Sequence, residues 1–207
     1  MPSTVSFAAK PTLTGDLVTL RPLTLADVPA VMAGLTDAES NRLTGTHRRF
    51  TTEQVETALR GWSGREDRID MAIIERATGE HAGEVVLNEL DADNLSCGFR
   101  IALSSRYTDR GLGSEATRLI LGHAFDTVGV HRVELEVFAF NPRARRVYEK
   151  VGFVYEGTKR QALRWQRDWI DTHVMAMLAD DWAAHRTSTV HSGHIDGHID
   201  GSATRPR

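Results

Sequence analysis

A glycine-rich segment carries the clearest chemical signal in the sequence. It reads Arg110-Gly-Leu-Gly-Ser-Glu-Ala116, and residues with helical hydrophobic spacing follow it. Glycines let a backbone approach a ligand closely, and the free amides at the start of a helix attract phosphate groups. The spacing therefore predicts a phosphate-binding turn at the N-terminus of a helix.

Other glycine-rich segments share parts of this pattern. A P-loop needs Lys followed by Ser or Thr after its last glycine, whereas Ser114-Glu115 stand there. A dinucleotide-binding fingerprint, G-x-G-x-x-A, is formally present. That fingerprint should follow its strand directly, but polar or aromatic residues fill positions 104–110. A turn that binds no ligand is the remaining alternative.

A second motif lies further along the chain, from Asn141 to Phe153, and reads NPRARRVYEKVGF. Asn followed by Pro is a helix-start signal, because Asn caps free amides and Pro at the first position needs no amide donor. The helix would present Tyr148 on its apolar face. Gly152 would end it.

Together, these motifs resemble those of the GCN5-related N-acetyltransferase (GNAT) superfamily. Its members typically have R/Q-x-x-G-x-G/A at a helix start, then a strand ending in Asn, and then a helix with Tyr followed by E-K-x-G-F. Residues 17–23 and 167–171, with Trp182, resemble the opening and closing segments of the ribosomal-protein-alanine N-acetyltransferase (RimJ/RimL-like) branch. Two positions depart from the family pattern: Thr108 replaces the usual Arg or Gln, and Ser96 replaces a frequent Glu.

The resemblance implies a fold and an activity. The fold would be a single α/β (α+β) domain with a mixed, mostly antiparallel central sheet, helices on both faces and a splay between two parallel strands. The protein would be an enzyme that transfers acetyl from acetyl-CoA to a primary amine by direct attack, with a protein or peptide N-terminus as the acceptor. A small-molecule amine (an aminoglycoside, an amino acid or a polyamine) is an alternative acceptor, and a non-catalytic acyl-CoA-binding module is an alternative function.

The resemblance also implies a cofactor site. The pyrophosphate would lie on amides near the glycines, and the pantetheine arm would pair with a splayed strand. Arginine side chains suit the phosphates. The expected cofactor-binding residues are Phe99, Ile101, Leu103, Arg106, Thr108, Arg110, Gly111, Leu112, Gly113, Ser114, Asn141, Arg143 and Arg146.

Acetyl transfer to an amine needs a neutral amine, a polarised carbonyl and a protonated leaving thiolate. The resemblance assigns thiolate protonation to Tyr148 and carbonyl polarisation to an amide near Ile101. The carboxylates on predicted strands that could accept the proton of the amine are Glu84, Glu89, Glu134 and Glu136. Glu136 is preferred because it lies nearer the splayed strand end, and Glu89 is the second candidate. Proton loss to water is the alternative.

Hydrophobic periodicity predicts the elements that position these residues. Strands are expected at 17–20, 71–75, 81–90, 96–103, 132–140, 153–159 and 170–178, and helices after Thr24, after Thr51, and over 114–128 and 142–151. The chain then divides into a flexible N-terminus (1–12), an N-acetyltransferase domain (13–186) and a disordered tail (187–207) that lacks core-forming residues. A weak metal-binding tract through His191, His194 and His198 is the alternative for the tail.

Composition limits the remaining classes of function. The 207 residues carry 25 basic and 28 acidic side chains, a net charge of −3, so nothing favours nucleic acid or an anionic membrane as a partner. A single cysteine, Cys97, excludes an internal disulfide framework, and we expect it to be a buried apolar residue rather than a nucleophile. We expect no metal, a cytoplasmic location, and a monomer or a homodimer.

Overall fold

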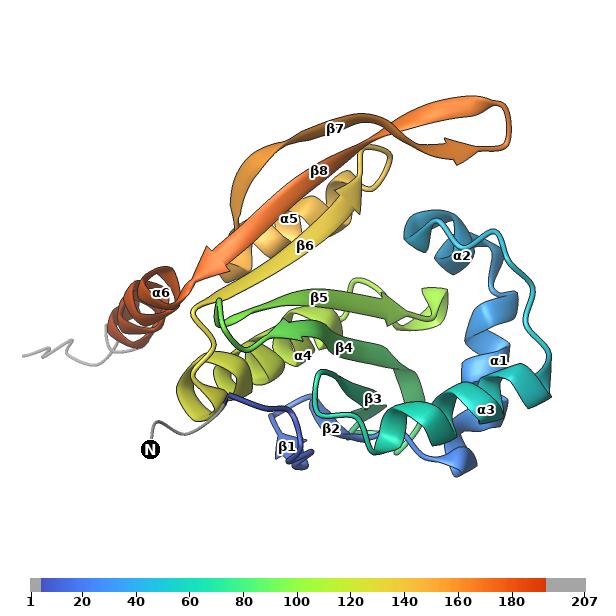
Figure 1. Cartoon of the computed structure of the whole chain (residues 1–207), viewed down its shortest axis with the longest axis horizontal. Helices are drawn as coiled ribbons and strands as arrows, with labels where there is room; N and C mark the ends of the chain where they lie inside the picture. Colours follow the sequence, from blue (N-terminus) through green and yellow to red (C-terminus); the bar gives the residue numbers. More distant parts are fainter. Residues whose placement is uncertain (1–4, 193–207) are drawn as a thin grey trace, which may run out of the picture.

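The computed structural model describes residues 5–192, with side chains described through Thr187. Its centre is one sheet in the order β1-β2-β3-β4-β5-β6-β8-β7 (Figure 1). The strands are β1 (Leu13–Thr14), β2 (Val18–Pro22), β3 (Ile69–Glu75), β4 (His81–Asp91), β5 (Ser96–Leu103), β6 (Arg132–Phe138), β7 (Val154–Trp165) and β8 (Asp168–Leu178). Among these strands only β5 and β6 run parallel. The predicted mixed, mostly antiparallel sheet is confirmed.

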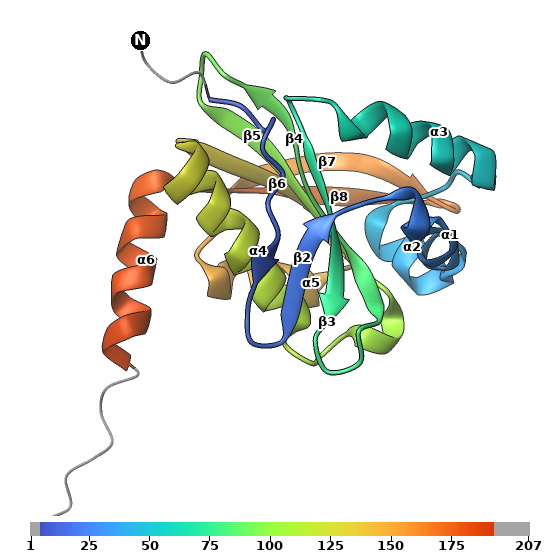
Figure 2. The same ribbon diagram turned by 90° about the horizontal axis from the view of Figure 1, so that it is seen from below.

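Two groups of helices cover the sheet. The first group is α1 (Val28–Thr36), α2 (Ala38–Thr44) and α3 (Thr52–Ser63), and the second is α4 (Leu112–Gly122) and α5 (Pro142–Val151). Apolar residues of α4 and α5 join the main core, whereas those of α1 and α3 form a separate small cluster. Figure 2 shows α1–α3 gathered on one side of the molecule, apart from α4. The final helix, α6 (Ala179–Ser192), follows β8.

The parallel pair produces the splay that positions the site. β5 and β6 are in register only over Ser96–Gly98 and Arg132–Glu134. Beyond Gly98 the two strands separate, so the edge of β5 from Phe99 to Leu103 is not paired with β6. The predicted splay between two parallel strands is confirmed.

Local signals explain several helix boundaries. Thr51 and Gln54 form the predicted capping box at the start of α3. The side chain of Asn141 accepts a hydrogen bond from the amide of Ala144, and α5 ends at Gly152 with a positive φ of 115°. These boundaries depend on residues close together in the chain, which makes them predictable.

Other elements differ from the expected order. A separate helix, α2, follows α1 because the Asp37 side chain accepts from the amide of Ser40 and starts a new helix at once. The helix expected over 114–128 starts at Leu112, and its last turns, His123–Val128, form a π-helix. β7 extends to Trp165 rather than to residue 159, since its pairing with β8 resumes over Leu163–Trp165 after an interruption that follows Lys159.

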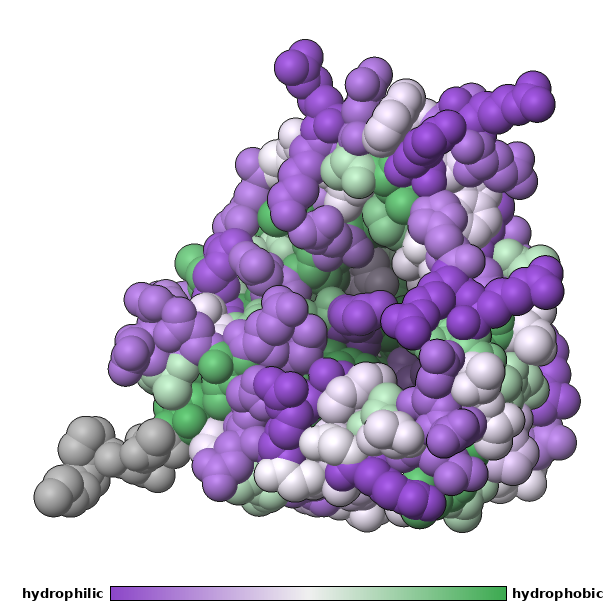
Figure 3. Space-filling model, turned by 45° about the vertical axis from the view of Figure 1, so that its right-hand side comes forward, coloured by the Kyte–Doolittle hydropathy of each residue, from purple (hydrophilic) through white to green (hydrophobic). Residues whose placement is uncertain are grey.

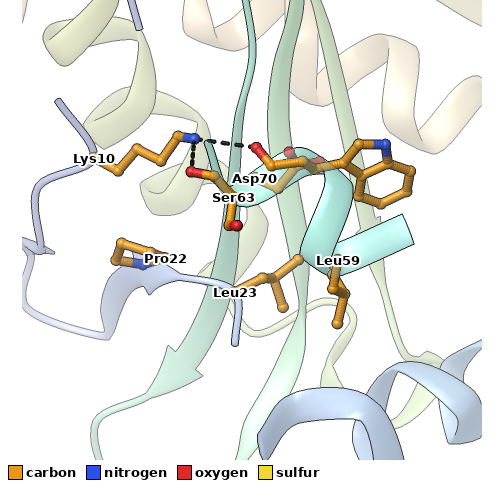
Figure 4. Close-up of a pocket in the computed structure, with 7 residues that line it drawn as sticks. Lys10, Pro22, Leu23, Leu59, Ser63 and Asp70 are labelled. Atoms are coloured by element: carbon orange, nitrogen blue, oxygen red, sulfur yellow. Dashed lines mark hydrogen bonds between the residues drawn. The ribbon is translucent and has the colours of Figure 1, made fainter. Parts of the chain in front are cut away.

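The terminal segments pack more extensively than their composition indicates. Within the segment 1–12, Phe7 is fully buried, and its amide donates to the carbonyl of Glu66. The ammonium of Lys10 donates to the carbonyls of Trp62 and Ser63 at the end of α3 (Figure 4), where a helix dipole favours a cation. At the other end α6 extends to Ser192, so residues 187–192 are helical. His194, His198 and the rest of the predicted tail lie outside the described residues.

Candidate active site

A cavity of about 250 Å³ lies where β5 and β6 separate. Its walls come from α2, from the end of β5 and the turn after it, and from the start of α5. The predicted cofactor residues in its lining are Leu103, Thr108, Asn141 and Arg143. Figure 3 shows this side of the molecule hollowed, with hydrophilic residues around much of the opening. Segments far apart in sequence therefore meet around one opening.

The glycine-rich turn leads into α4 beside this cavity. Gly111 is the N-cap of α4 with φ of +81°, a conformation that favours glycine, and no side chain caps the helix there. A Cβ on Gly113 would lie 2.9 Å from Cδ1 of Leu103, so a larger residue there would force the Leu103 side chain at the end of β5 to move. The first amides of α4, around Leu112 and Ser114, thus have no side-chain cap, and phosphate binding by these amides stays a prediction.

The predicted phosphate-binding arginines are mostly engaged with carboxylates. Arg110 pairs with the buried carboxylate of Glu75. The guanidinium of Arg106 lies 3.9 Å from Glu80, and that of Arg143 lies 3.1 Å from Asp109.

Arg146 is exposed on α5 and has no ion pair among the described side chains. An anion at this turn would therefore interact mainly with backbone amides, and Arg146 is the one of the four predicted arginines without a carboxylate partner among the described side chains.

Tyr148 of α5 lies in the core beside the splayed strand. Its ring packs edge-on against Phe99 of β5 at 6.0 Å and against Phe153 at 5.9 Å. Burial raises the pKa of Tyr148 above its usual range. The hydroxyl, like that of any tyrosine, is protonated at neutral pH, the form that an acid catalyst requires.

The two carboxylates preferred as bases from the sequence, Glu136 and Glu89, lie in different parts of the structure. The Glu136 carboxylate is half exposed and already bound by the ammonium of Lys159. Glu89 is exposed beyond Asn88, which pairs with Gly98, so it lies at the end of β4 opposite to the splay. Strand position alone could not reveal the Lys159 partner or the irregular register of β4 after Asn88.

Glu84 differs from both residues. It lies on β4 in register with Ala72 of β3 and Ala102 of β5, and 28% of its side-chain surface remains exposed. Burial, together with the charges of Asp70 and Asp27, raises the pKa of Glu84 to about 7. The sequence identifies Glu84 as a strand carboxylate but gives no reason to prefer it, because its surroundings come from other strands.

Cys97 is buried, as expected, and burial raises the pKa of its thiol to about 12. At neutral pH it is a thiol rather than a thiolate, which makes it a poor nucleophile. Among the side chains that the structure describes, residues 5–187, no group of three or more His, Cys, Asp or Glu could hold a metal ion.

Comparison with known proteins agrees with this geometry. The family model of the acetyltransferase (GNAT) domain matches residues 18–154. The chain belongs to the GNAT family. The matched region includes both the glycine-rich turn and Tyr148, so the two motifs that carry the resemblance lie inside it.

Relatives in this family are named for different acceptors. The chain is 39% identical over 81 residues to an L-amino acid N-acetyltransferase of Escherichia coli, covering 39% of this chain and 49% of the relative. It is 30% identical over 91 residues to spermidine N(1)-acetyltransferase of the same organism, covering 44% and 49%. Each match thus spans about half of the relative, and the branch within the family is not determined by them.

The fold also matches a solved structure closely. Spermidine N-acetyltransferase from Vibrio cholerae, in complex with CoA and spermine, superposes with a TM-score of 0.77 at 19% identity, over 82% of this chain and 99% of the other. At this identity the likeness concerns the fold. No helix in the described part of the chain has the length and apolar character needed to cross a membrane.

Proposed function

We propose that this protein transfers the acetyl group of acetyl-CoA directly to a primary amine. The observation that carries this proposal is the uncapped, glycine-led start of α4 beside a cavity between two separating parallel strands. The amides of α4 would bind the pyrophosphate. The unpaired edge of β5 from Phe99 to Leu103 would pair with the amides of the pantetheine arm, as an added strand does.

The chemical step follows from this placement. The thioester carbonyl would lie against the free edge of β5, where a backbone amide near Ile101 donates to the developing oxyanion. The neutral amine attacks the carbonyl carbon, and the carbon–sulfur bond of the resulting tetrahedral intermediate breaks. Tyr148 gives its proton to the departing thiolate. The buried, protonated Cys97 favours this direct route over a covalent acetyl-enzyme.

The charges around the cavity favour an acceptor that carries acidic groups. The carboxylates beside the opening are already paired, Glu39 with Arg42 and Asp109 with Arg143. The loop after α2 carries a basic cluster, residues 47–49 (His-Arg-Arg). A polyamine would need several unpaired carboxylates. We therefore propose a peptide or protein N-terminus as the acceptor, as in the ribosomal-protein branch, with a small-molecule amine as the alternative.

An acceptor screen tests this proposal. Thiol release from acetyl-CoA is measured with a short acidic peptide, the same peptide with a blocked N-terminus, an L-amino acid, spermidine and an aminoglycoside. We expect the highest kcat/KM with the free peptide and no turnover with the blocked one. Highest kcat/KM with spermidine would contradict the acceptor class. Binding of acetyl-CoA without thiol release to any amine would instead indicate a non-catalytic module.

A further inference from the structure

Glu84 occupies an unusual place in the sheet. The row of paired residues across the sheet reads Arg21, Ala72, Glu84 and Ala102, on β2, β3, β4 and β5. Its neighbours in this row, Ala72 and Ala102, have small side chains, and 28% of the Glu84 side-chain surface is exposed. Ala102 belongs to the unpaired edge of β5. Glu84 therefore lies one strand away from the edge that would hold the thioester.

The neighbouring charged groups are neutralised by partners other than Glu84. Asp27 receives two hydrogen bonds from Arg21, at 2.8 and 2.6 Å. Asp70 receives two from Arg68, at 2.8 and 2.6 Å. These two carboxylates are thus held in place as ion pairs. Glu84 has no arginine or lysine partner among the described side chains, and its one charged-group contact there is His81.

The remaining groups that face Glu84 do not neutralise it. Nε2 of His81, also on β4, lies 4.0 Å from Oε1 of Glu84 and has no hydrogen-bond partner among the described atoms. Burial lowers the pKa of His81, so its ring is neutral at pH 7. Arg100 of β5 lies one register pair along the same face, opposite Val86, and is exposed. α1, which contacts β4, has no charged side chain.

The splay gives Glu84 access to the reaction. Alternation along the strands places Glu84 and Ala102 on one face of the sheet and Phe99, which packs on Tyr148, on the other. An intact sheet would separate groups on its two faces. Beyond Gly98, however, β5 and β6 are no longer paired, so an atom in the gap is accessible from both faces.

We propose that Glu84 accepts the proton of the acceptor amine, and this inference rests on the proposed acetyl transfer. The ammonium of the acceptor gives one N–H proton to the Glu84 carboxylate, which later releases it to water. The neutral nitrogen forms a bond to the carbonyl carbon, and the carbon–sulfur bond breaks. The thiolate takes the proton of Tyr148, and the second N–H proton restores the Tyr148 hydroxyl. A carboxylate that titrates near neutral pH suits this role.

The test compares Glu84→Gln and Glu84→Asp with a matched variant, Glu156→Gln. Glu156 is a strand carboxylate of β7 that pairs with Arg132 at the start of β6, the end away from the splay. The acidic peptide serves as the acceptor throughout, so its own amine ionisation is the same for every variant. The measurements are kcat and kcat/KM from pH 5.5 to 9, and the acetyl-CoA Kd by calorimetry.

We expect Glu84→Gln to lower kcat about 100-fold and to remove the part of the rise in kcat/KM that occurs near pH 7. The acetyl-CoA Kd should stay within about twofold of the wild-type value, since Glu84 lies outside the cofactor site. Glu84→Asp, which keeps a carboxylate, should recover part of kcat and show a shifted pH profile. Glu156→Gln should match the wild-type protein in all three measurements.

Two failures are distinguishable. If Glu84→Gln binds acetyl-CoA normally and keeps the wild-type kcat and pH profile, Glu84 is not the proton acceptor, and the proposed acetyl transfer still stands. If the wild-type protein acetylates no amine, the proposed function fails and this inference fails with it. Should Glu84→Gln not fold, Glu84→Asp gives the same decision, because an unchanged pH profile in that variant overturns the proposal.

Discussion

Tyr148 is the side chain that we propose as the acid catalyst. Its hydroxyl is protonated at neutral pH, as in any tyrosine, burial raises its pKa further, and its ring packs between Phe99 and Phe153. Replacing Tyr148 with Phe keeps the ring and removes only the proton donor. The residue is therefore suited to a test that separates catalysis from binding.

We predict that Tyr148→Phe lowers kcat about 100-fold and leaves the acetyl-CoA Kd nearly unchanged, because acid catalysis acts on the leaving thiolate rather than on binding. Steady-state kinetics and calorimetry measure the two effects. Lost acetyl-CoA binding in a folded Tyr148→Phe protein would assign this tyrosine a structural role instead.

The raised pKa of Glu84 also leads to a prediction about the pH dependence of stability. Its pKa rises from 4.5 to about 7 on folding, so between these values the folded state binds more protons than the unfolded state. The contribution of Glu84 to stability is therefore complete below about pH 4.5 and is lost as pH rises through about 7. Glu84→Gln lacks this loss. The free energy of unfolding of Glu84→Gln, minus that of the wild-type protein, should increase by on the order of 2 kcal/mol from pH 5 to pH 8.

Urea unfolding at both pH values measures this difference, and groups other than Glu84 cancel in the subtraction. A difference independent of pH would mean that Glu84 titrates normally in the folded protein.

The sequence predicts site residues best where the relevant partners are close in the chain. The spacing of Gly111 and Gly113 and the cap at Asn141 are local features, and the structure has the expected turn and helix start. Glu84 could not be preferred over Glu136, because the sequence does not tell which strand supplies Ala72 or that Lys159 pairs with Glu136.

At the level of elements, the start of α4 is the feature on which the proposed phosphate site depends. Gly111 adopts φ of +81° at this start, and Gly129 adopts a similar φ of +82° at the end of the π-helix, where a side chain would meet no neighbouring atom within 4 Å of its Cβ. The two glycines therefore carry the same backbone strain when replaced, but only Gly111 lies at the proposed phosphate site.

We predict that Gly111→Val raises the acetyl-CoA Kd at least about 10-fold, because a displaced turn misaligns the amides of α4. The free energy of unfolding of Gly129→Val should fall by about 1–2 kcal/mol, as that of Gly111→Val should, but its acetyl-CoA Kd should equal the wild-type value. Thermal unfolding and calorimetry separate the two effects. Equal loss of affinity in both variants would indicate general destabilisation rather than a phosphate site.

The elements themselves were predictable where apolar periodicity or caps were present. The meander β3-β4-β5 and the helix start at Asn141 follow from such signals. The length of β7 did not, because nearly all of its side chains are exposed and it has no buried alternation. α2 was missed since it has no buried residue, and only the Asp37 cap separates it from α1.

At the scale of the whole molecule, the cavity is bounded by segments that meet only after folding. His47, in the loop after α2, contacts the ring of Trp165 at the end of β7, with ring centroids 4.8 Å apart. Figure 1 shows α2 and the far end of the β7–β8 hairpin on the same side of the molecule. On the α2 side, Asp37 accepts hydrogen bonds from the amide and hydroxyl of Ser105. These contacts hold α2, which lines the cavity, and the loop after it against the hairpin and the turn after β5.

We predict that Trp165→Ala raises the KM of the peptide acceptor about 3–10-fold, because the loss of one packed aromatic contact loosens the acceptor side of the opening. The acetyl-CoA Kd should not change. Trp169→Ala, on the same hairpin and 59% exposed, is the control and should behave as the wild-type protein. An equal rise in KM in both variants would contradict a specific role for the Trp165 ring and would indicate an effect of the hairpin as a whole.

The central claim is that acetyl-CoA binds at the start of α4 between the separated strands. Calorimetric titration of acetyl-CoA into the purified protein tests it most directly. We predict one binding site with a Kd at or below the micromolar range, about −8 kcal/mol or more favourable. Folded protein that gives no binding heat at any temperature tried would contradict the claim, and the glycine-rich turn would then have only a structural role.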